Sequence, residues 1–431
     1  DGGIQVAQGA WRVVTDHIPF PPFDFWRSSR MMPPTISITE FPFWSFLFAD
    51  LHAHLMGMPF YLLVIGLALN MALGWKRGVG FTSETASLLL AALAIGALRV
   101  INSWDYPTFI LLAGAGVAIG EIGARRGLDT GAVVWVVLKL AALVVLSTLF
   151  FQPFHEKFKV FYNGVLPSAA QTPLLQYLSV HGLFLFLVVS YVVFELWRAA
   201  RSSARRPGQT PVGIGAALAD QRGLVTAPPY GGPTSIGADA SGGVYFWPVY
   251  TGVIGAAALT LYLLRYETVA FLFVLLAVVA ALAQVTLERP REEGAAPRLY
   301  VLALIALALG LGIGVDMITV QGDIERMNTV FKFYLQAWVL LGLASAFVLW
   351  RLGAGMALPA RPLGLPRVAW MTPFALLLAA SLAFPVLGTP ARIADRFVAL
   401  PPTNDGMAYM QFALHREEDR EMELRWDYEA I

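Results

Sequence analysis

Two carboxylates and two histidines stand close together in an otherwise aromatic stretch, residues 40–54. The carboxylates are Glu40 and Asp50, and the histidines are His52 and His54. If the segment is extended, alternate side chains share one side; if it is helical, Asp50 and His54 lie one turn apart. Either geometry could hold a divalent metal ion through Asp50, His52 and His54, or build an acid–base pair. The structural alternative is a helix start that Asp50 caps.

A second polar group leads into an apolar segment near residue 330. Asn328, Lys332 and Gln336 recur every four residues, so they form one polar stripe on a helix. Inside a membrane such a stripe faces the bundle interior or a water-filled cavity. Arg326 and Lys332 are candidates to bind phosphate, arginine through its fork and lysine as a point charge. The alternative for Lys332 is snorkelling to the lipid headgroups.

A third group lies in a short turn between two apolar segments. Arg99 is another candidate to bind phosphate, and Asn102, Trp104 and Asp105 follow within six residues. We expect Trp104 to stack on a sugar ring and the two polar side chains to hydrogen-bond its hydroxyls. The structural alternative is an interfacial tryptophan next to a turn aspartate.

The elements that position these groups are predicted to be membrane helices. The chain has 431 residues, of which 57% are hydrophobic and 14% charged, whereas soluble domains have about 25% charged residues. A membrane span needs about 20 mainly apolar residues, and we find about ten candidates between residues 55 and 387. The sequence therefore predicts an all-α polytopic integral membrane protein. Lys139 falls in mid-span, where we expect it to pair with Glu121.

The loops alternate in character, and one set carries clusters of Lys and Arg, which predicts a multi-pass topology in the cell membrane. The loop 199–243, rich in Gly, Pro, Ser and Ala, is predicted to be a flexible cytoplasmic linker. Three parts then share the extracytoplasmic face: the loop 1–54, the polar turns, and the tail 388–431. We expect the first loop to carry short interfacial helices, with Trp11, Trp26 and Trp44 anchored among lipid headgroups. Because the chain begins at Asp1 and ends in a charged stretch, we also expect it to be part of a longer protein.

Several function classes are excluded by missing features. Cysteine is absent, so the chain has no disulfide, thiol nucleophile or thiolate metal site. The sequence lacks a phosphate-binding P-loop, a nucleophile elbow and a dinucleotide fingerprint. The net charge of +1 and the lack of basic–aromatic clusters indicate no nucleic-acid partner.

Three of these motifs resemble the "YYY" membrane-protein family of chloroflexi and archaea. They are EFPFWSFLFADLHAH at 40–54, NSWDYPT at 102–108 and ERMNTVFKFY at 325–334. The tail from residue 405 resembles the lead-in to that family's outer soluble domain. The family is grouped loosely with GT-C-type glycosyltransferases, which use sugars linked to lipid phosphates at the outer membrane face. The resemblance implies a GT-C-like helix bundle whose catalytic carboxylate lies in the first outer loop, where Asp1, Glu40 and Asp50 are the candidates.

Our leading hypothesis is a membrane glycosyltransferase with a polyprenyl-phosphate-linked sugar donor as its partner, embedded among membrane lipids. Arg326, Lys332 and Arg99 would hold the phosphate, and one of the carboxylates would deprotonate the acceptor. Two alternatives stay open. One is a metal-dependent membrane hydrolase or phosphotransferase, and the other is a non-catalytic scaffold subunit of a membrane complex.

Overall fold

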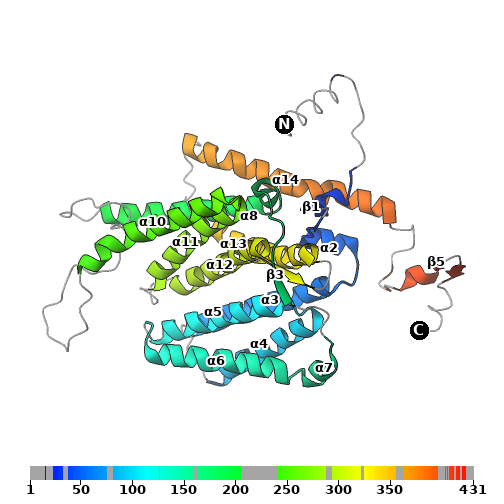
Figure 1. Ribbon diagram of the computed structural model, residues 1–431, viewed down its shortest axis with the longest axis horizontal. Coiled ribbons are helices and arrows are strands. Elements are labelled where there is room, and N and C mark those ends of the chain that lie inside the picture. The colour runs from blue at the N-terminus through cyan, green and yellow to red at the C-terminus, as the bar shows by residue number, and fades with distance from the viewer. Residues whose placement is uncertain are drawn as a thin grey trace. The chain divides into compact units, whose positions relative to one another are not determined.

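The computed structural model describes residues 15, 23–32, 37–74, 81–125, 127–159, 164–204, 240–287, 294–321, 325–355 and 364–396, with short pieces between 403 and 423. The predicted linker 199–243 lies mostly outside these residues, and so does Asp1. The described part consists mainly of helices (Figure 1). It divides into two units, residues 26–384 and residues 1–25 with 385–431.

The larger unit begins with short elements and continues with long helices. The first loop holds a 3-10 turn and the helix α2, which supports the expectation of short helices there, together with a small hairpin that the sequence did not predict. These elements are η1 (Arg27–Ser29), β1 (Arg30–Met32), β2 (Ser37–Ile38) and α2 (Pro42–Phe48). The helices that follow are α3 (Ala53–Leu73), α4 (Phe81–Ile101), α5 (Tyr106–Arg125), α6 (Thr130–Leu149), α7 (Gln152–Lys157), α8 (Leu174–Ala204), α10 (Ala240–Leu263), α11 (Glu267–Leu287), α12 (Ala295–Met317), α13 (Glu325–Gly355) and α14 (Leu365–Arg396).

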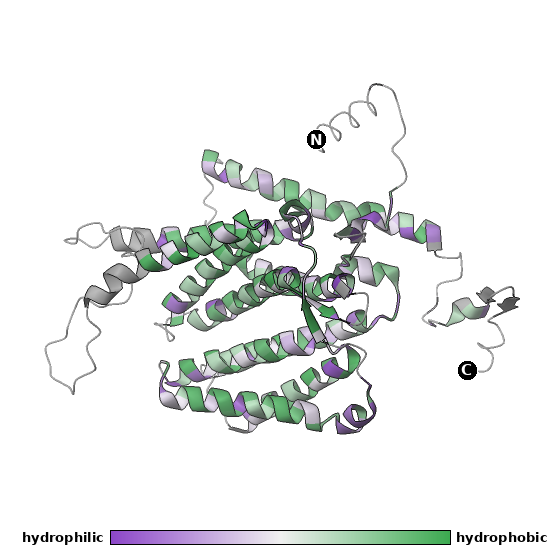
Figure 2. Cartoon of the chain, in the orientation of Figure 1, coloured by the Kyte–Doolittle hydropathy of each residue, from purple (hydrophilic) through white to green (hydrophobic). Residues whose placement is uncertain are grey.

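Nine of the described helices are long and apolar enough to cross a membrane. They correspond to nine of the ten predicted spans; α10 accounts for the tenth, with a described apolar part that is shorter, Val249–Leu263. Hydrophobic residues cover these helices along most of their length (Figure 2). The prediction of an all-α polytopic membrane protein is confirmed.

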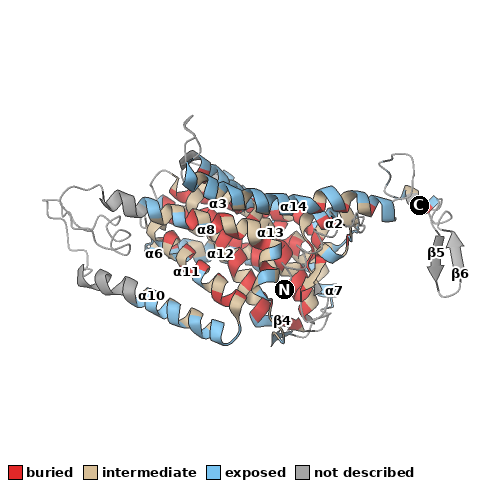
Figure 3. Cartoon of the chain, turned by 90° about the horizontal axis from the view of Figure 1, so that it is seen from above, coloured by how far each residue is buried: buried red, intermediate tan, exposed pale blue. Residues whose placement is uncertain are grey.

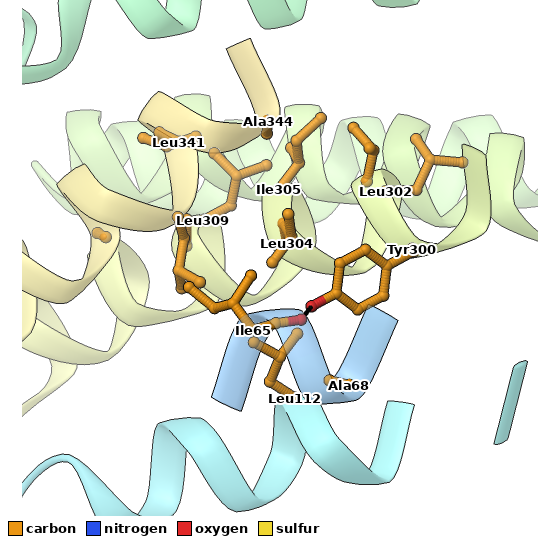
Figure 4. Close-up of a cluster of buried hydrophobic side chains, with 14 of the residues drawn as sticks. Ile65, Ala68, Leu112, Tyr300, Leu302, Leu304, Ile305, Leu309, Leu341 and Ala344 are labelled. Atoms are coloured by element: carbon orange, nitrogen blue, oxygen red, sulfur yellow. Dashed lines mark hydrogen bonds between the residues drawn. The ribbon is translucent and has the colours of Figure 1, made fainter. Parts of the chain in front are cut away.

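The spans of the larger unit pack in two groups joined through α12. Helices α3, α4, α5 and α6 pack together, as do α8, α11, α12 and α13, and α12 also contacts α3 and α5 (Figure 1). Among the described spans α12 is the most buried and α14 the least, as the colouring of Figure 3 shows. Where α12 meets α3, the Tyr300 hydroxyl donates a 2.6 Å hydrogen bond to the Ile65 carbonyl within an apolar cluster (Figure 4).

Glycine allows α3 and α5 to approach closely. Gly116 and Gly120 lie one turn apart on α5 and face the backbone of α3. A Cβ at Gly120 would lie 2.5 Å from the Met71 carbonyl oxygen, and one at Gly116 would overlap the Ala68 carbonyl. Small residues at this spacing are typical of tight helix pairs in membranes, where van der Waals contact takes the place of a hydrophobic driving force.

A small hairpin connects two loops that are far apart in the sequence. Strand β3 (Gly164–Pro167) precedes α8, and strand β4 (Ile318–Gln321) joins α12 to α13. The two strands pair antiparallel, with Gly164 opposite Gln321. This pairing brings the loop before α8 next to the beginning of α13.

One prediction for the first loop was wrong. Trp44 is fully buried rather than anchored among headgroups, and Trp11 lies outside the described residues. Its ring stacks on Phe48 and meets Trp26 edge-on at 5.7 Å between ring centres, and the Arg30 guanidinium lies over it. Aromatic partners within the loop satisfy this side chain, because the loop folds on itself.

The smaller unit holds the end of α14 and three short elements. These are η3 (Ala408–Gln411), β5 (Leu414–Glu417) and β6 (Arg420–Glu423), of which the two strands form a hairpin. Helix α14 runs to Arg396, nine residues beyond the predicted end of the last span at residue 387. In its last turns, the Arg392 guanidinium lies over the ring of Phe25 at 5.1 Å.

Candidate functional site

The beginning of α13 contacts every polar cluster that the sequence indicated. Arg326 forms an ion pair with the end of α12, and the Phe331 ring packs on His54. Lys332 and Gln336 both reach the turn between α4 and α5. Segments that are far apart in the sequence therefore meet on one helix end.

Glu40 and His54 form a buried pair where α2 meets α3. The Glu40 Oε2 atom accepts a 2.8 Å hydrogen bond from Ser45 and lies 3.1 Å from Nε2 of His54. Both side chains are at most 5% exposed. Because α2 carries Ser45 and α3 carries His54, the pair links α2 to α3. A buried carboxylate needs such partners to offset its desolvation.

Asp50 and His52 form a second pair, which is open to solvent. Helix α2 ends at Phe48, and the left-handed backbone of its C-cap residue Ala49 (φ 58°) turns the chain toward His52, the N-cap residue of α3. Nδ1 of His52 lies 2.9 Å from Oδ2 of Asp50, and both side chains are about half exposed. The His52 ring also lies 6.5 Å from Phe331, centre to centre. Of the two candidate carboxylates that the structure describes, Glu40 is buried and Asp50 is open to solvent.

Asp105 is completely buried within a ring of polar side chains. Its Oδ1 atom accepts hydrogen bonds from Asn102 at 3.0 Å and from Gln336 at 2.8 Å. Its Oδ2 atom lies beside the Tyr61 hydroxyl without the geometry of a hydrogen bond. Burial raises the pKa of Asp105 to about 7, although its hydrogen bonds and the charge of Lys332 act in the opposite direction. A carboxyl group with this pKa can change its protonation state near neutral pH.

Close to Asp105, Lys332 and Trp104 line a small open pocket. The Lys332 ammonium lies 5.7 Å from the centre of the Trp104 ring, within range of a cation–π interaction. The lining is completed by Asn328, Thr329, Val320 and Phe333, around a cavity of about 10 Å³ that opens to solvent. The sequence predicted that the polar stripe on this helix faces a cavity or the bundle interior. In the structure Asn328 and Lys332 face the pocket, and Gln336 faces the bundle interior.

Arg326 lies in a buried network rather than at the pocket. Its NH2 group donates to Asp316 at 2.8 Å and to Thr172 at 2.9 Å. Its NH1 group donates to Ser168 and to the Val315 carbonyl, both at 2.7 Å. These bonds hold the loop before α8, the end of α12 and the start of α13 together. A phosphate would reach Arg326 only after displacing these partners.

Two further cations lie away from the pocket. Arg99 donates to Thr148 on α6 at 3.1 Å and lies over the Tyr106 ring. Its charge, after partial burial, contributes to lowering the pKa of His155 on α7. Lys139 pairs with Glu121 as expected, and Glu84 of α4 is its second partner.

The structure thus brings together some of the predicted residues. Lys332, Trp104, Asn328, Asn102 and Asp105 form one neighbourhood, and the His52 ring lies 6.5 Å from that of Phe331, the residue before Lys332. In the part of the chain that the structure describes, no group of three metal-ligating side chains assembles. The histidine–carboxylate contacts occur as two separate pairs.

In the comparison with protein families, residues 3–341 match a family model. The matching family is described as an uncharacterized membrane protein (DUF2298). The chain belongs to this family. No curated protein and no solved structure matches the chain. As a DUF2298 protein with this set of apolar helices, the chain is a multi-pass membrane protein.

Sequence reasoning missed several residues of the candidate site in this DUF2298 protein. Tyr61 and Thr108 lie inside apolar runs, and the partners of Gln336 come from another helix pair. One local signal was present, because His54, Gly57 and Tyr61 recur at helical spacing on the face of α3 that is buried. The contacts of Thr172 with Asp316 and Tyr334 join residues more than 140 positions apart, which no local pattern indicates.

Proposed function

We propose that the protein is a membrane glycosyltransferase that takes its sugar from a polyprenyl-phosphate donor at the extracytoplasmic face. The observation that carries this proposal is the pocket where Lys332 lies against Trp104. An indole face suits the apolar side of a sugar ring, and an ammonium group suits the neighbouring phosphate. The GT-C resemblance of the motifs around these residues supports the same reaction by analogy.

The reaction assigns roles to residues at the mouth of the bundle. The acceptor hydroxyl oxygen attacks the anomeric carbon, and the bond from that carbon to the phosphate oxygen breaks. The electron pair goes to the phosphate, whose charge Lys332 stabilises. Asp50 takes the acceptor proton, and its contact with His52 holds the carboxylate in place.

Other predicted residues then hold parts of the site in place and do not contact the substrate. Gln336 bonds both the Asp105 carboxylate and the Trp104 carbonyl, so this network fixes the turn that presents the indole. Arg326 fixes the start of α13 through Asp316 and thereby the direction of Lys332. Glu40 holds α2 against α3 through His54.

The test uses the full chain in lipid nanodiscs with polyprenyl phosphates that carry radiolabelled sugars. Donor binding and release or transfer of the sugar are both measured. We expect Lys332→Gln to weaken donor binding at least tenfold, because the phosphate loses its cation. Asp50→Asn should keep binding and lose transfer. The matched control is Lys157→Gln, which removes an exposed lysine from α7.

Three outcomes would overturn the proposal. The first is that no polyprenyl-phosphate sugar binds, as expected for a scaffold subunit. The second is equal activity of Lys332→Gln and the unaltered protein. The third is release of phosphate without transfer of sugar, as expected for a hydrolase or phosphotransferase.

A further inference from the structure

His52 and His54 each have one ring nitrogen against a carboxylate. Nδ1 of His52 lies 2.9 Å from Asp50, and Nε2 of His54 lies 3.1 Å from Glu40. In metal sites a ligating histidine commonly uses one nitrogen for the ion and gives the other to a carboxylate, which fixes the ring and raises its basicity. His52 and His54 therefore have the carboxylate contacts that are typical of histidines that bind a metal ion.

The spacing of the two rings also fits one shared ion. Their centres lie 5.2 Å apart with the ring planes tilted by 30°. A nitrogen–zinc distance near 2.0–2.1 Å and a tetrahedral angle place two ligating rings roughly 5 Å apart. The nitrogens left for the ion are Nε2 of His52 and Nδ1 of His54.

The surroundings keep both rings in place. The Phe331 ring meets His54 edge-on at 4.5 Å and His52 at 6.5 Å, so one apolar wall borders the pair. His54 is buried and held by α3, whereas His52 is half exposed. An ion between them would have a fixed side and a side open to solvent.

We propose that His52 and His54 bind one divalent transition-metal ion of the zinc or copper class. Asp50 and Glu40 orient the two rings from outside the coordination shell. The described residues supply no third side-chain ligand, so water or an oxygen of a bound molecule completes the shell. Imidazole ligands select zinc, copper or nickel over magnesium and calcium, which prefer oxygen. The proposal stands on these contacts and does not depend on the transferase reaction.

The experiment measures bound metal in the full chain, purified through a tag without histidine and dialysed against zinc, copper or magnesium salts. Elemental analysis should find one zinc or copper ion per chain and no retained magnesium. Copper spectra should show nitrogen ligands. His52→Ala should abolish binding; this side chain is exposed, so we expect the variant to fold. Asp50→Asn keeps both ligands and should weaken binding about 10–100-fold.

The matched control is His155→Ala, which removes an outer-face histidine that lies outside the pair. It should bind metal as the unaltered protein does. Absence of stoichiometric zinc or copper would overturn the proposal, and so would binding that His52→Ala leaves unchanged. Metal content is measured without substrate. A failure of metal binding therefore does not decide whether the protein transfers sugar, and a failure of sugar transfer does not decide whether it binds metal.

Discussion

At the scale of residues, we expect the protonation of Asp105 to make the stability of the folded protein depend on pH. Its pKa is raised from 3.8 to about 7, chiefly by burial. Between these values the folded state holds a proton that the unfolded state has lost. The free energy of unfolding therefore falls as pH rises through this window, and this contribution levels off above about pH 7.

Asp105→Asn removes this dependence, because an amide mimics the protonated acid and still accepts from Asn102 and Gln336. We expect the melting temperature of the variant relative to the unaltered protein to rise from pH 5 to pH 8. Thermal unfolding in detergent across that range measures the difference. Asp129→Asn, at an exposed helix cap, is the control for the loss of a carboxylate at the surface. If the melting temperatures of Asp105→Asn and the unaltered protein change with pH in parallel, the expectation is contradicted.

Single residues also show how far the sequence could predict the site. The pairing of Lys139 with Glu121 was predictable, since a mid-span lysine needs a carboxylate and few are within reach. Its second partner Glu84 was not, because nothing local relates α4 to α6. The burial of Arg326 also escaped prediction, since its ion pair depends on how the end of α12 returns to α13.

At the scale of elements, the contact of α3 with α5 depends on glycine. Gly116→Ala would place a methyl group against the Ala68 carbonyl, which belongs to backbone and cannot rotate away. We expect the helices to separate slightly, with a loss of about 1–3 kcal/mol in stability. Thermal or denaturant unfolding in detergent would measure it.

The control for that change lies on the partner helix. Gly66 of α3 has no atom within 4 Å of the position a Cβ would take. Gly66→Ala should therefore be neutral or stabilising by up to about 1 kcal/mol, because alanine is the better helix former. Equal stability of the two variants would argue against a glycine-dependent contact.

Helices were the elements that the sequence predicted best, since apolar length alone defines a span. The hairpin between β3 and β4 was not predictable, because each strand has only four residues and its partner lies more than 150 positions away. That hairpin supplies Val320 to the pocket. The site therefore depends on an element whose pairing is set by tertiary structure.

At the scale of the whole molecule, the direction of the helices places the polar clusters at one end of the larger unit. The Asp50–His52 pair precedes α3, the Asp105 turn follows α4, and the Lys332 pocket lies where α13 begins. The loop between α5 and α6 lies at the other end. If the positive-inside rule orients the protein correctly, the first end is extracytoplasmic and the second is cytoplasmic.

The absence of cysteine makes this orientation directly measurable. Leu51→Cys and Leu128→Cys replace side chains that are 82% and 74% exposed, one at each end. In intact cells we expect an impermeant maleimide to label Leu51→Cys and to label Leu128→Cys only after permeabilisation. The reversed pattern would place the Lys332 pocket in the cytoplasm, where the proposed outer-face donor does not reach it. A Cys at Leu112, which is buried between helices, controls for non-specific labelling and should stay unmodified in both conditions.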